Sequence, residues 1–227
     1  MIFRKHFSER ESHMKFTSKL VLLVAMGATG LTALSGMASA QESYAVTKYE
    51  ASRAGGVDTQ ALTFGLSGSY GSGFAYDMKL MSADTSGTST IGADVELSYR
   101  ISGIAGPVAL YETREMGGAH SDQLLIGFEG GTEMFGADLS GKALFDADDK
   151  DQFRVAIGVD YALSKDLSID GALTHFQNVG AADANKIELG ARYNIAGNLH
   201  ADVGAHYERA QGGAEAKGLH LGLGFSF

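Results

Sequence analysis

The sequence alternates apolar residues with small or polar residues over long stretches, and its C-terminal end shows the pattern most clearly. From Leu219 to Phe227 every second residue is leucine or phenylalanine, and the residues between them are histidine, glycine and serine. Successive side chains of a β-strand point to opposite faces of the sheet. The segment therefore predicts a strand with one apolar face and one small, polar face.

The same alternation predicts twelve strands between residues 41 and 227. The clearest are 89–101, 152–163, 185–195, 199–209 and 217–227, and the weaker ones are 43–53, 59–70, 74–83, 107–115, 121–131, 135–145 and 167–177. Each is about as long as the ~9–11 residues that cross a bilayer at a tilt. We therefore predict an all-β fold, a transmembrane antiparallel up-and-down β-barrel. Segment 43–53 has the poorest pattern and could fold inside, so eight or ten strands are alternatives.

The segments between the predicted strands are of two kinds. Those at 71–73, 164–166 and 196–198 are short, whereas 84–88, 116–120, 146–151, 178–185 and 209–216 are longer and more polar. Outer-membrane barrels have short periplasmic turns and longer external loops. The alternation thus predicts that both termini lie on the short-turn side. Aromatic residues near that side predict an interfacial girdle, made of Tyr70, Tyr99, Phe128, Tyr161, Tyr193 and Phe227.

Residues 1–40 have the features of an export signal. Lys15 and Lys19 precede an apolar run over 20–34, and Ala38-Ser-Ala40 supplies small residues for cleavage before Gln41. Glycine and threonine dilute the run below the roughly 20 apolar residues of a membrane anchor. We therefore predict a signal peptide over 1–40, with Met14 as an alternative start, and a barrel over 41–227.

Charge narrows the classes of partner. The whole chain has 18 basic and 27 acidic residues, and residues 1–40 contain five of the basic and two of the acidic ones. Residues 41–227 are left with 13 basic and 25 acidic residues and a net charge of −12. This balance argues against nucleic acid, whose phosphate backbone requires a basic surface. The chain has no cysteine, which suits an oxidising compartment.

Several local patterns together resemble one known family. Tyr161 and Tyr193 each begin a module of tyrosine, leucine or isoleucine, tight turn and leucine, the strands are rich in glycine, and Phe227 ends the chain. These features resemble the porins of Gram-negative bacteria. The resemblance implies an outer-membrane barrel without a cofactor, whose last strand carries an assembly signal at Leu223, Phe225 and Phe227. The chain is much shorter than a 16-stranded general porin and has no long loop to constrict the pore, so neither trimeric assembly nor general-porin selectivity follows, and the oligomeric state is left open.

The polar faces of the clear strands carry charges and histidines, and we expect them to face the interior. The candidate pore-lining residues are Asp94, Glu96, Arg100, Arg154, Asp160, Lys186, Glu188, Arg192, His200, Asp202, His206, Glu208 and His220. In one interpretation they line a wet pore and set its field. In the other they pair across the interior and close it. Eight strands leave an interior filled by side chains and 16–18 leave an open channel, so twelve strands favour a narrow pore.

Metal binding is not predicted. His200 and His206 share a face but lie six residues apart, roughly 20 Å along a strand, so only a meeting of one of them with His220 could bring two histidines together. The acidic segment 146–151 fails the calcium-loop pattern because Lys150 and Asp151 stand where an oxygen ligand and a glycine belong. It is interpreted as a solvated loop, with a loose divalent-ion bridge to lipopolysaccharide phosphates as the alternative.

Catalytic motifs are also missing from the pattern. His175 is expected on the outer wall, but no serine and acid stand at a spacing that would complete a hydrolase site. Ser67 follows Gly65, yet Ser69 occupies the place of the second glycine in a nucleophile elbow. We therefore expect no enzyme and no cofactor. The predicted function is passive diffusion of small hydrophilic solutes or ions through the outer membrane, in contact with its lipid and lipopolysaccharide. The alternatives are a closed structural or adhesion barrel acting through its loops, and an outer-membrane lipid hydrolase.

Overall fold

The computed structural model describes residues 42–70, 73–101, 104–149, 151–177 and 183–227. The predicted signal peptide and its cleavage site lie outside these residues. Within them, no helix has the length and apolar character needed to cross a membrane.

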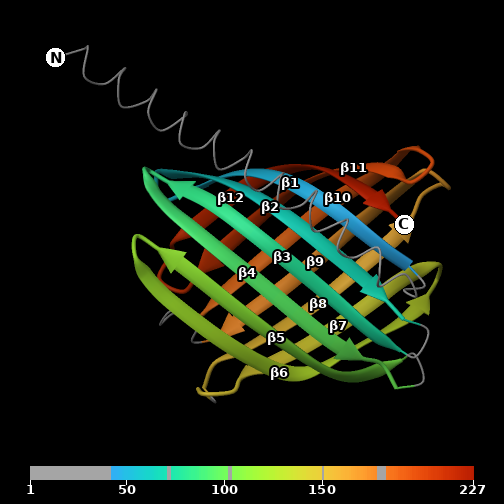
Figure 1. Ribbon diagram of the computed structural model, residues 1–227, viewed down its shortest axis with the longest axis horizontal. Helices are drawn as coiled ribbons and strands as arrows, with labels where there is room; N and C mark the ends of the chain where they lie inside the picture. The colour runs from blue at the N-terminus through green and yellow to red at the C-terminus, as the bar shows by residue number, and fades with distance from the viewer. Residues whose placement is uncertain (1–41, 71–72, 102–103, 150, 178–182) are drawn as a thin grey trace, which may run out of the picture.

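The described residues form twelve antiparallel strands (Figure 1). Their bounds are β1 Glu42–Ala54, β2 Val57–Ser69, β3 Phe74–Thr85, β4 Thr88–Tyr99, β5 Ala105–Met116, β6 Ala119–Met134, β7 Ala137–Asp146, β8 Phe153–Ala162, β9 Leu167–Gln177, β10 Ala184–Ala196, β11 Leu199–Ala210 and β12 Glu215–Ser226. Each predicted strand is found, with ends that differ by at most three residues.

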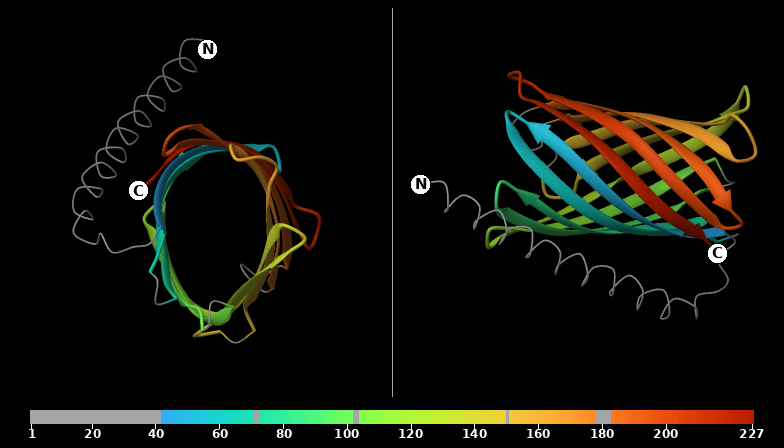
Figure 2. Two further views of the ribbon diagram at one scale, coloured as in Figure 1. Left: turned by 90° about the vertical axis from the view of Figure 1, so that its right-hand side faces the viewer. Right: turned by 90° about the horizontal axis from the view of Figure 1, so that it is seen from above.

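The first and last strands close the sheet into a barrel. β1 pairs with β12 from Tyr44 opposite Ser226 to Ala54 opposite Ala216, and every other strand pairs with its neighbours in the chain. Figure 2 shows the closed wall end-on and the tilt of the strands from above. The prediction of a twelve-stranded up-and-down barrel is confirmed. Segment 43–53 is a wall strand, so the alternatives of eight or ten strands are wrong.

The two faces of the wall differ in exposure as expected of a membrane barrel, with exposed apolar side chains outside and buried polar side chains inside. The outward leucines of β12 are exposed, with Leu219 67% and Leu221 63% exposed, whereas the inward His200 and Asp202 of β11 are 3% and 8% exposed. Closure satisfies the backbone hydrogen bonds of every strand, as a hydrocarbon environment requires. The apolar residues therefore face outward to lipid and the polar residues face inward.

The connections differ from the predicted alternation of short turns and long loops. β1–β2, β3–β4 and β5–β6 are joined by two residues each, at 55–56, 86–87 and 117–118. The predicted longer loops at 84–88 and 116–120 are therefore wrong. Ser86, Gly87, Gly117 and Gly118 have positive φ, which lets the strands continue to pair up to the turn. Loop length thus gives no general distinction between the two ends of this barrel.

The aromatic side chains also depart from the prediction at one strand. β6 continues to Met134, so Phe128 lies in the middle of the strand rather than at its end. The turn that follows contains Phe135, which is 94% exposed and has a φ of 55°. Tyr99, Tyr161 and Tyr193 lie near strand ends and are exposed on the outer wall, as predicted.

Inside the barrel, one side of the wall carries a small apolar core. Val108 and Leu110 of β5, Leu125 of β6 and Leu144 of β7 form the inner apolar cluster, and Leu125 and Leu144 are 0% and 1% exposed. β5 and β6 lie at one narrow end of the oval cross-section in Figure 2. Inward apolar residues therefore fill the sharp bend of the wall, where there is no room for water.

Candidate pore interior

Twelve of the thirteen predicted pore-lining residues lie on the inner parity of their strands. The strand register continues the inward positions from β4 to β12 through Asp94, Glu96, Arg154, Asp160, Lys186, Glu188, Arg192, His200, Asp202, His206, Glu208 and His220. Arg100 follows the end of β4 and reaches Glu129 inside the barrel, with 3.2 Å between Nε and Oε1. Their contact with passing solutes stays a prediction.

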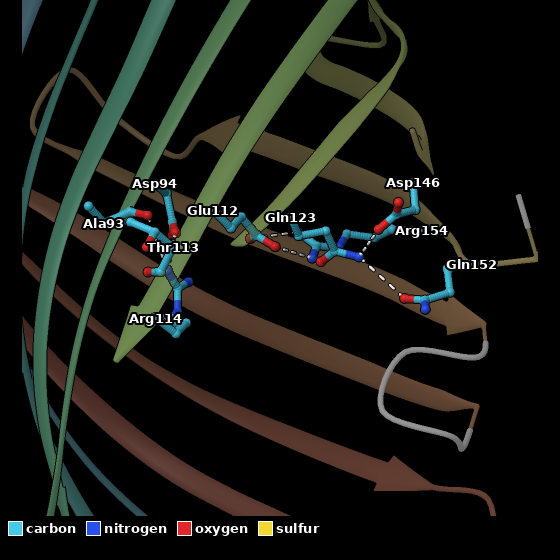
Figure 3. Close-up of polar contacts among 9 residues, drawn as sticks. All are labelled: Ala93, Asp94, Glu112, Thr113, Arg114, Gln123, Asp146, Gln152 and Arg154. Carbon is cyan, nitrogen blue, oxygen red and sulfur yellow. Dashed lines mark hydrogen bonds and ion pairs between the residues drawn. The ribbon is translucent and has the colours of Figure 1, made fainter. Parts of the chain in front are cut away.

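Ion pairs cross the inner apolar cluster from one flank to the other. Arg154 of β8 donates through Nη1 and Nη2 to both carboxylate oxygens of Glu112 on β5, at 3.2 and 2.9 Å (Figure 3). Lys142 of β7 pairs with Glu96 of β4 and lies 3.5 Å from Glu129 of β6. The Arg154–Glu112 pair crosses β6 and β7, and the Lys142–Glu96 pair crosses β5 and β6. Charged side chains thus cover the inner apolar cluster on the side that faces the barrel interior.

The end of the barrel at the β7–β8 connection is also fixed by side-chain contacts. Gln123 of β6 donates to Asp146 at 2.6 Å and to Gln152 at 3.3 Å (Figure 3). Asp146 accepts the backbone N–H groups of Asp148 and Asp149, at 2.7 and 2.9 Å. The connection from β7 to β8 is six residues long, in agreement with the predicted loop at 146–151, and Asp148 and Asp149 are held to the end of β7.

The opposite wall, built by β10, β11 and β12, carries histidines that lie over glycines of the neighbouring strand. His200 faces Gly224, His206 faces Gly218 and His220 faces Gly204 in the register. A Cβ at Gly224 would stand 2.1 Å from the His200 Nε2, and one at Gly204 would stand 2.3 Å from the His220 Cε1. These glycines make room for the imidazole rings. Among the described residues, no group of three or more potential ligands is placed to hold a metal ion.

Tyr44 of β1 contacts side chains of β10 and β11 in the interior. Its ring lies below the Arg192 guanidinium at 5.5 Å and meets the His200 ring edge-on at 6.4 Å. Arg192 donates from Nε to Asp202 Oδ1 at 2.7 Å. The His200 Nε2 and Asp202 Oδ2 atoms are buried without a hydrogen-bond partner and stand 3.7 Å apart.

Four carboxylates stand side by side across β6 to β9. Glu133 is opposite Asp138, Asp138 is opposite Asp160, and Asp160 is opposite Asp170. We call them the acidic row. They line a cavity of about 670 Å³ that Arg100 also lines. Carboxylates at neighbouring positions repel one another, so this part of the interior attracts positive charge.

A second cavity, of about 330 Å³, lies against β1 to β4. We call it the serine cavity. Its polar lining includes Tyr44, Ser67, Ser69, Asp77, Glu96 and Ser98, and Arg100 lines this cavity as well as the acidic one. The Arg100 side chain therefore borders both cavities.

Sequence reasoning missed the interior residues of the weaker strands. Glu112, Arg114, Glu129, Lys142 and Asp138 all lie on the inner parity, and the first four form the ion pairs that hold the bend. The period of two along β5, β6 and β7 could have placed them. It was obscured because these strands carry apolar residues on both faces.

The structure does not bring together the serine and the histidine considered for a catalytic site. His175 lies on the outer wall, where its Nδ1 is 3.0 Å from Asn185 Oδ1, and its register partner on β8 is Val155. Ser67 lies on the inner face, opposite Tyr44 and Asp77. The serine and the histidine are therefore on different sides of the wall.

On the outer surface, an apolar groove of about 630 Å³ crosses β3 to β7. Its lining includes Phe74, Tyr99, Pro107, Ala109 and Phe128. Its lining belongs to the surface that faces lipid.

Comparison with known proteins identifies the fold. No protein-family model matches the sequence, and no curated protein matches it. Among solved structures, the KdgM porin is similar with a TM-score of 0.56 and 12% identity, over 80% of this chain and 99% of that one. The NanC porin has a TM-score of 0.57 and 11% identity over 79% and 98%, and an outer-membrane channel from Pseudomonas putida F1 has 0.53 and 10% over 82% and 95%. The chain thus has the fold of small outer-membrane channel barrels.

Proposed function

We propose that the protein is a passive pore of the bacterial outer membrane for small hydrophilic solutes, with a preference for cations over anions. The single observation that carries this proposal is the closed barrel with lipid-facing apolar residues outside and a charged interior that contains two cavities. The fold of known channel proteins supports it. No cofactor is required for diffusion.

The route through the barrel avoids the bend at β5 and β6. The inner apolar cluster and the Arg154–Glu112 and Lys142–Glu96 pairs occupy that side of the interior. Solutes therefore pass along the rest of the interior and through the two cavities that Arg100 borders. A path narrowed in this way has room for small solutes but not for a segment of polypeptide.

Charge decides which solutes are favoured. Among the described inward positions, acidic side chains outnumber basic ones, and the acidic row faces a cavity in which Arg100 is the basic residue of the lining. A related structure shows the KdgM porin in complex with oligogalacturonate, an acidic ligand. The surplus of carboxylates here opposes such anions, because like charges focused in a narrow pore raise the barrier to entering it.

Planar-bilayer recording of the purified protein tests both parts of the proposal. We expect discrete conductance steps and a reversal potential in a KCl gradient that shows K⁺ preference. Replacing three members of the acidic row, Asp138→Asn, Asp160→Asn and Asp170→Asn, should lower the K⁺/Cl⁻ permeability ratio by about twofold or more, since each removes a unit of charge near the path.

A matched triple variant controls for total charge. Asp58→Asn, Asp122→Asn and Glu215→Gln neutralise carboxylates at outward positions and should leave the permeability ratio unchanged. A pure protein that gives no conductance steps refutes the pore. Equal effects of the two triples refute the role of the acidic row.

A closed structural or adhesion barrel is the second candidate, because the apolar cluster and its ion pairs already fill one side of the interior. Liposome swelling separates the two functions. A pore admits small sugars and the vesicles swell, whereas a closed barrel leaves them unchanged.

We also propose that β12 carries the signal for the outer-membrane assembly machinery. Leu223, Phe225 and Phe227 face outward and are 58%, 48% and 51% exposed at the end of the chain. Replacing Phe227 with alanine should reduce the amount of folded protein in outer-membrane fractions, whereas Leu219→Ala on the same face should not.

A further inference from the structure

The serine cavity has a polar lining whose charges cancel. Its carboxylates are Asp77, Glu96 and Glu129. Asp77 is 3.1 Å from Lys79, Glu96 pairs with Lys142, and Glu129 is 3.2 Å from Arg100. In contrast to the acidic row, this cavity offers no net charge to select an ion.

Two hydroxyl groups and two paired carboxylates follow one another along a continuous row of the cavity lining. Tyr44 is opposite Ser67, Ser67 is opposite Asp77, and Asp77 is opposite Glu96. Ser69 and Ser98 lie in the same lining. A hydroxyl can both donate and accept a hydrogen bond, and a carboxylate accepts several. The lining therefore matches a molecule that carries several neutral groups able to do both.

Ser67 shows that the hydrogen-bonding capacity of this wall is not used up within the protein. The residue is 9% exposed, and its hydroxyl is buried without a partner. A buried polar atom without a partner is uncommon in folded proteins. Rotation about χ1 would turn this hydroxyl between staggered positions, so it can meet a group that enters the cavity.

The size of the cavity limits the ligand. A volume of about 330 Å³ lies at the small end of the roughly 300–1,000 Å³ of known small-molecule sites. This size suits one monosaccharide ring with its hydroxyl groups better than an oligosaccharide. The Tyr44 ring, which has the Arg192 guanidinium on one side, contributes an apolar surface to the lining.

We propose that the serine cavity is a binding subsite for a neutral polyhydroxylated solute of monosaccharide size, which pauses there on its way through the pore. This inference rests on the proposed pore function and names a class of solute for it. A sugar acid is disfavoured because Lys79, Lys142 and Arg100 are already paired with the carboxylates of the cavity, which leaves its own carboxylate without a basic partner.

Block of the open-channel current by D-glucose tests the subsite. We expect a saturable fall in K⁺ current as D-glucose is added, and a much smaller one with D-glucuronate at the same concentration. Ser67→Ala should weaken the apparent affinity for D-glucose by about threefold to tenfold, the effect of losing one hydrogen bond. Ser121→Ala, at an inward position near the start of β6, should not change it.

A second measurement separates failure of the subsite from failure of the pore. Saturation-transfer NMR of the protein in detergent micelles detects D-glucose binding without any current, and Ser67→Ala should reduce the transferred signal while Ser121→Ala does not. Equal behaviour of the two variants, a linear fall in current that follows viscosity alone, or stronger binding of D-glucuronate overturns the subsite. Absence of current with intact D-glucose binding overturns the pore and leaves the subsite standing.

Discussion

The bend at β5 to β7 depends on a glycine that no other residue can replace. Gly127 of β6 lies opposite Leu144 of β7, and a Cβ added to it would stand 1.8 Å from the Ala143 carbonyl oxygen and 2.8 Å from the carbonyl carbon. Ordinary van der Waals contact begins at 3.4 Å. The atom in the way belongs to the backbone, so no side chain can rotate aside. Gly127→Ala must therefore move β6 away from β7.

The cost of this substitution follows from what the movement breaks. Forcing a methyl group into a packed site costs about 1–3 kcal/mol, and each strand hydrogen bond lost beside it costs about 0.5–1.5 kcal/mol. We expect Gly127→Ala to lower the free energy of unfolding by about 2–6 kcal/mol. Urea unfolding of the protein in phospholipid vesicles, followed by the shift in gel migration of the folded barrel, measures it.

Gly141 of β7 provides the matched control. A Cβ at this position meets nothing within 4 Å, so Gly141→Ala should change stability by less than about 1 kcal/mol, in the stabilising direction. If both variants unfold at the same urea concentration, the close approach of β6 and β7 is not a feature of the folded protein, and the reasoning on the bend is refuted.

Three further substitutions test the interior and one turn. Leu125→Ala should lower stability by about 2–5 kcal/mol because the side chain is fully buried in the inner apolar cluster, whereas the lipid-facing Leu221→Ala should cost much less in the same urea titration. Arg154→Ala should lower stability by about 1–3 kcal/mol because it leaves Glu112 without its partner, and the double variant with Glu112→Ala should recover part of the loss in a double-mutant cycle. Phe135→Asn should raise stability by about 1 kcal/mol, since asparagine tolerates the positive φ that phenylalanine adopts there.

Each of these expectations has an outcome that contradicts it. Equal losses for the two leucine variants would mean that the interior cluster is no better packed than the lipid-facing wall. A double variant as unstable as the sum of the single ones would show that Arg154 and Glu112 do not interact. A less stable Phe135→Asn variant would indicate that the exposed ring contributes more, as an interfacial anchor, than its backbone conformation costs.

The sequence by itself determined the architecture, because a two-residue period separates the faces of a strand before any contact is known. The alternation in 217–227 and 199–209 was enough to assign Leu219 and Leu221 to lipid and His200 and Asp202 to the interior, and the structure agrees. Strand length and turn residues then set the number of strands. These are local properties, and local properties can be derived from a single sequence.

Only the tertiary structure decided which inward residues meet. Arg154 and Glu112 are 42 residues apart and touch because the barrel bends sharply between β5 and β8. That bend depends on the backbone approach at Gly127 and on Leu125 and Leu144 packing inside, which break the rule of a polar interior. The same closure brings Tyr44 of the first strand against Arg192 of the tenth. Such contacts depend on curvature and shear of the whole wall, and no repeat along the chain encodes them.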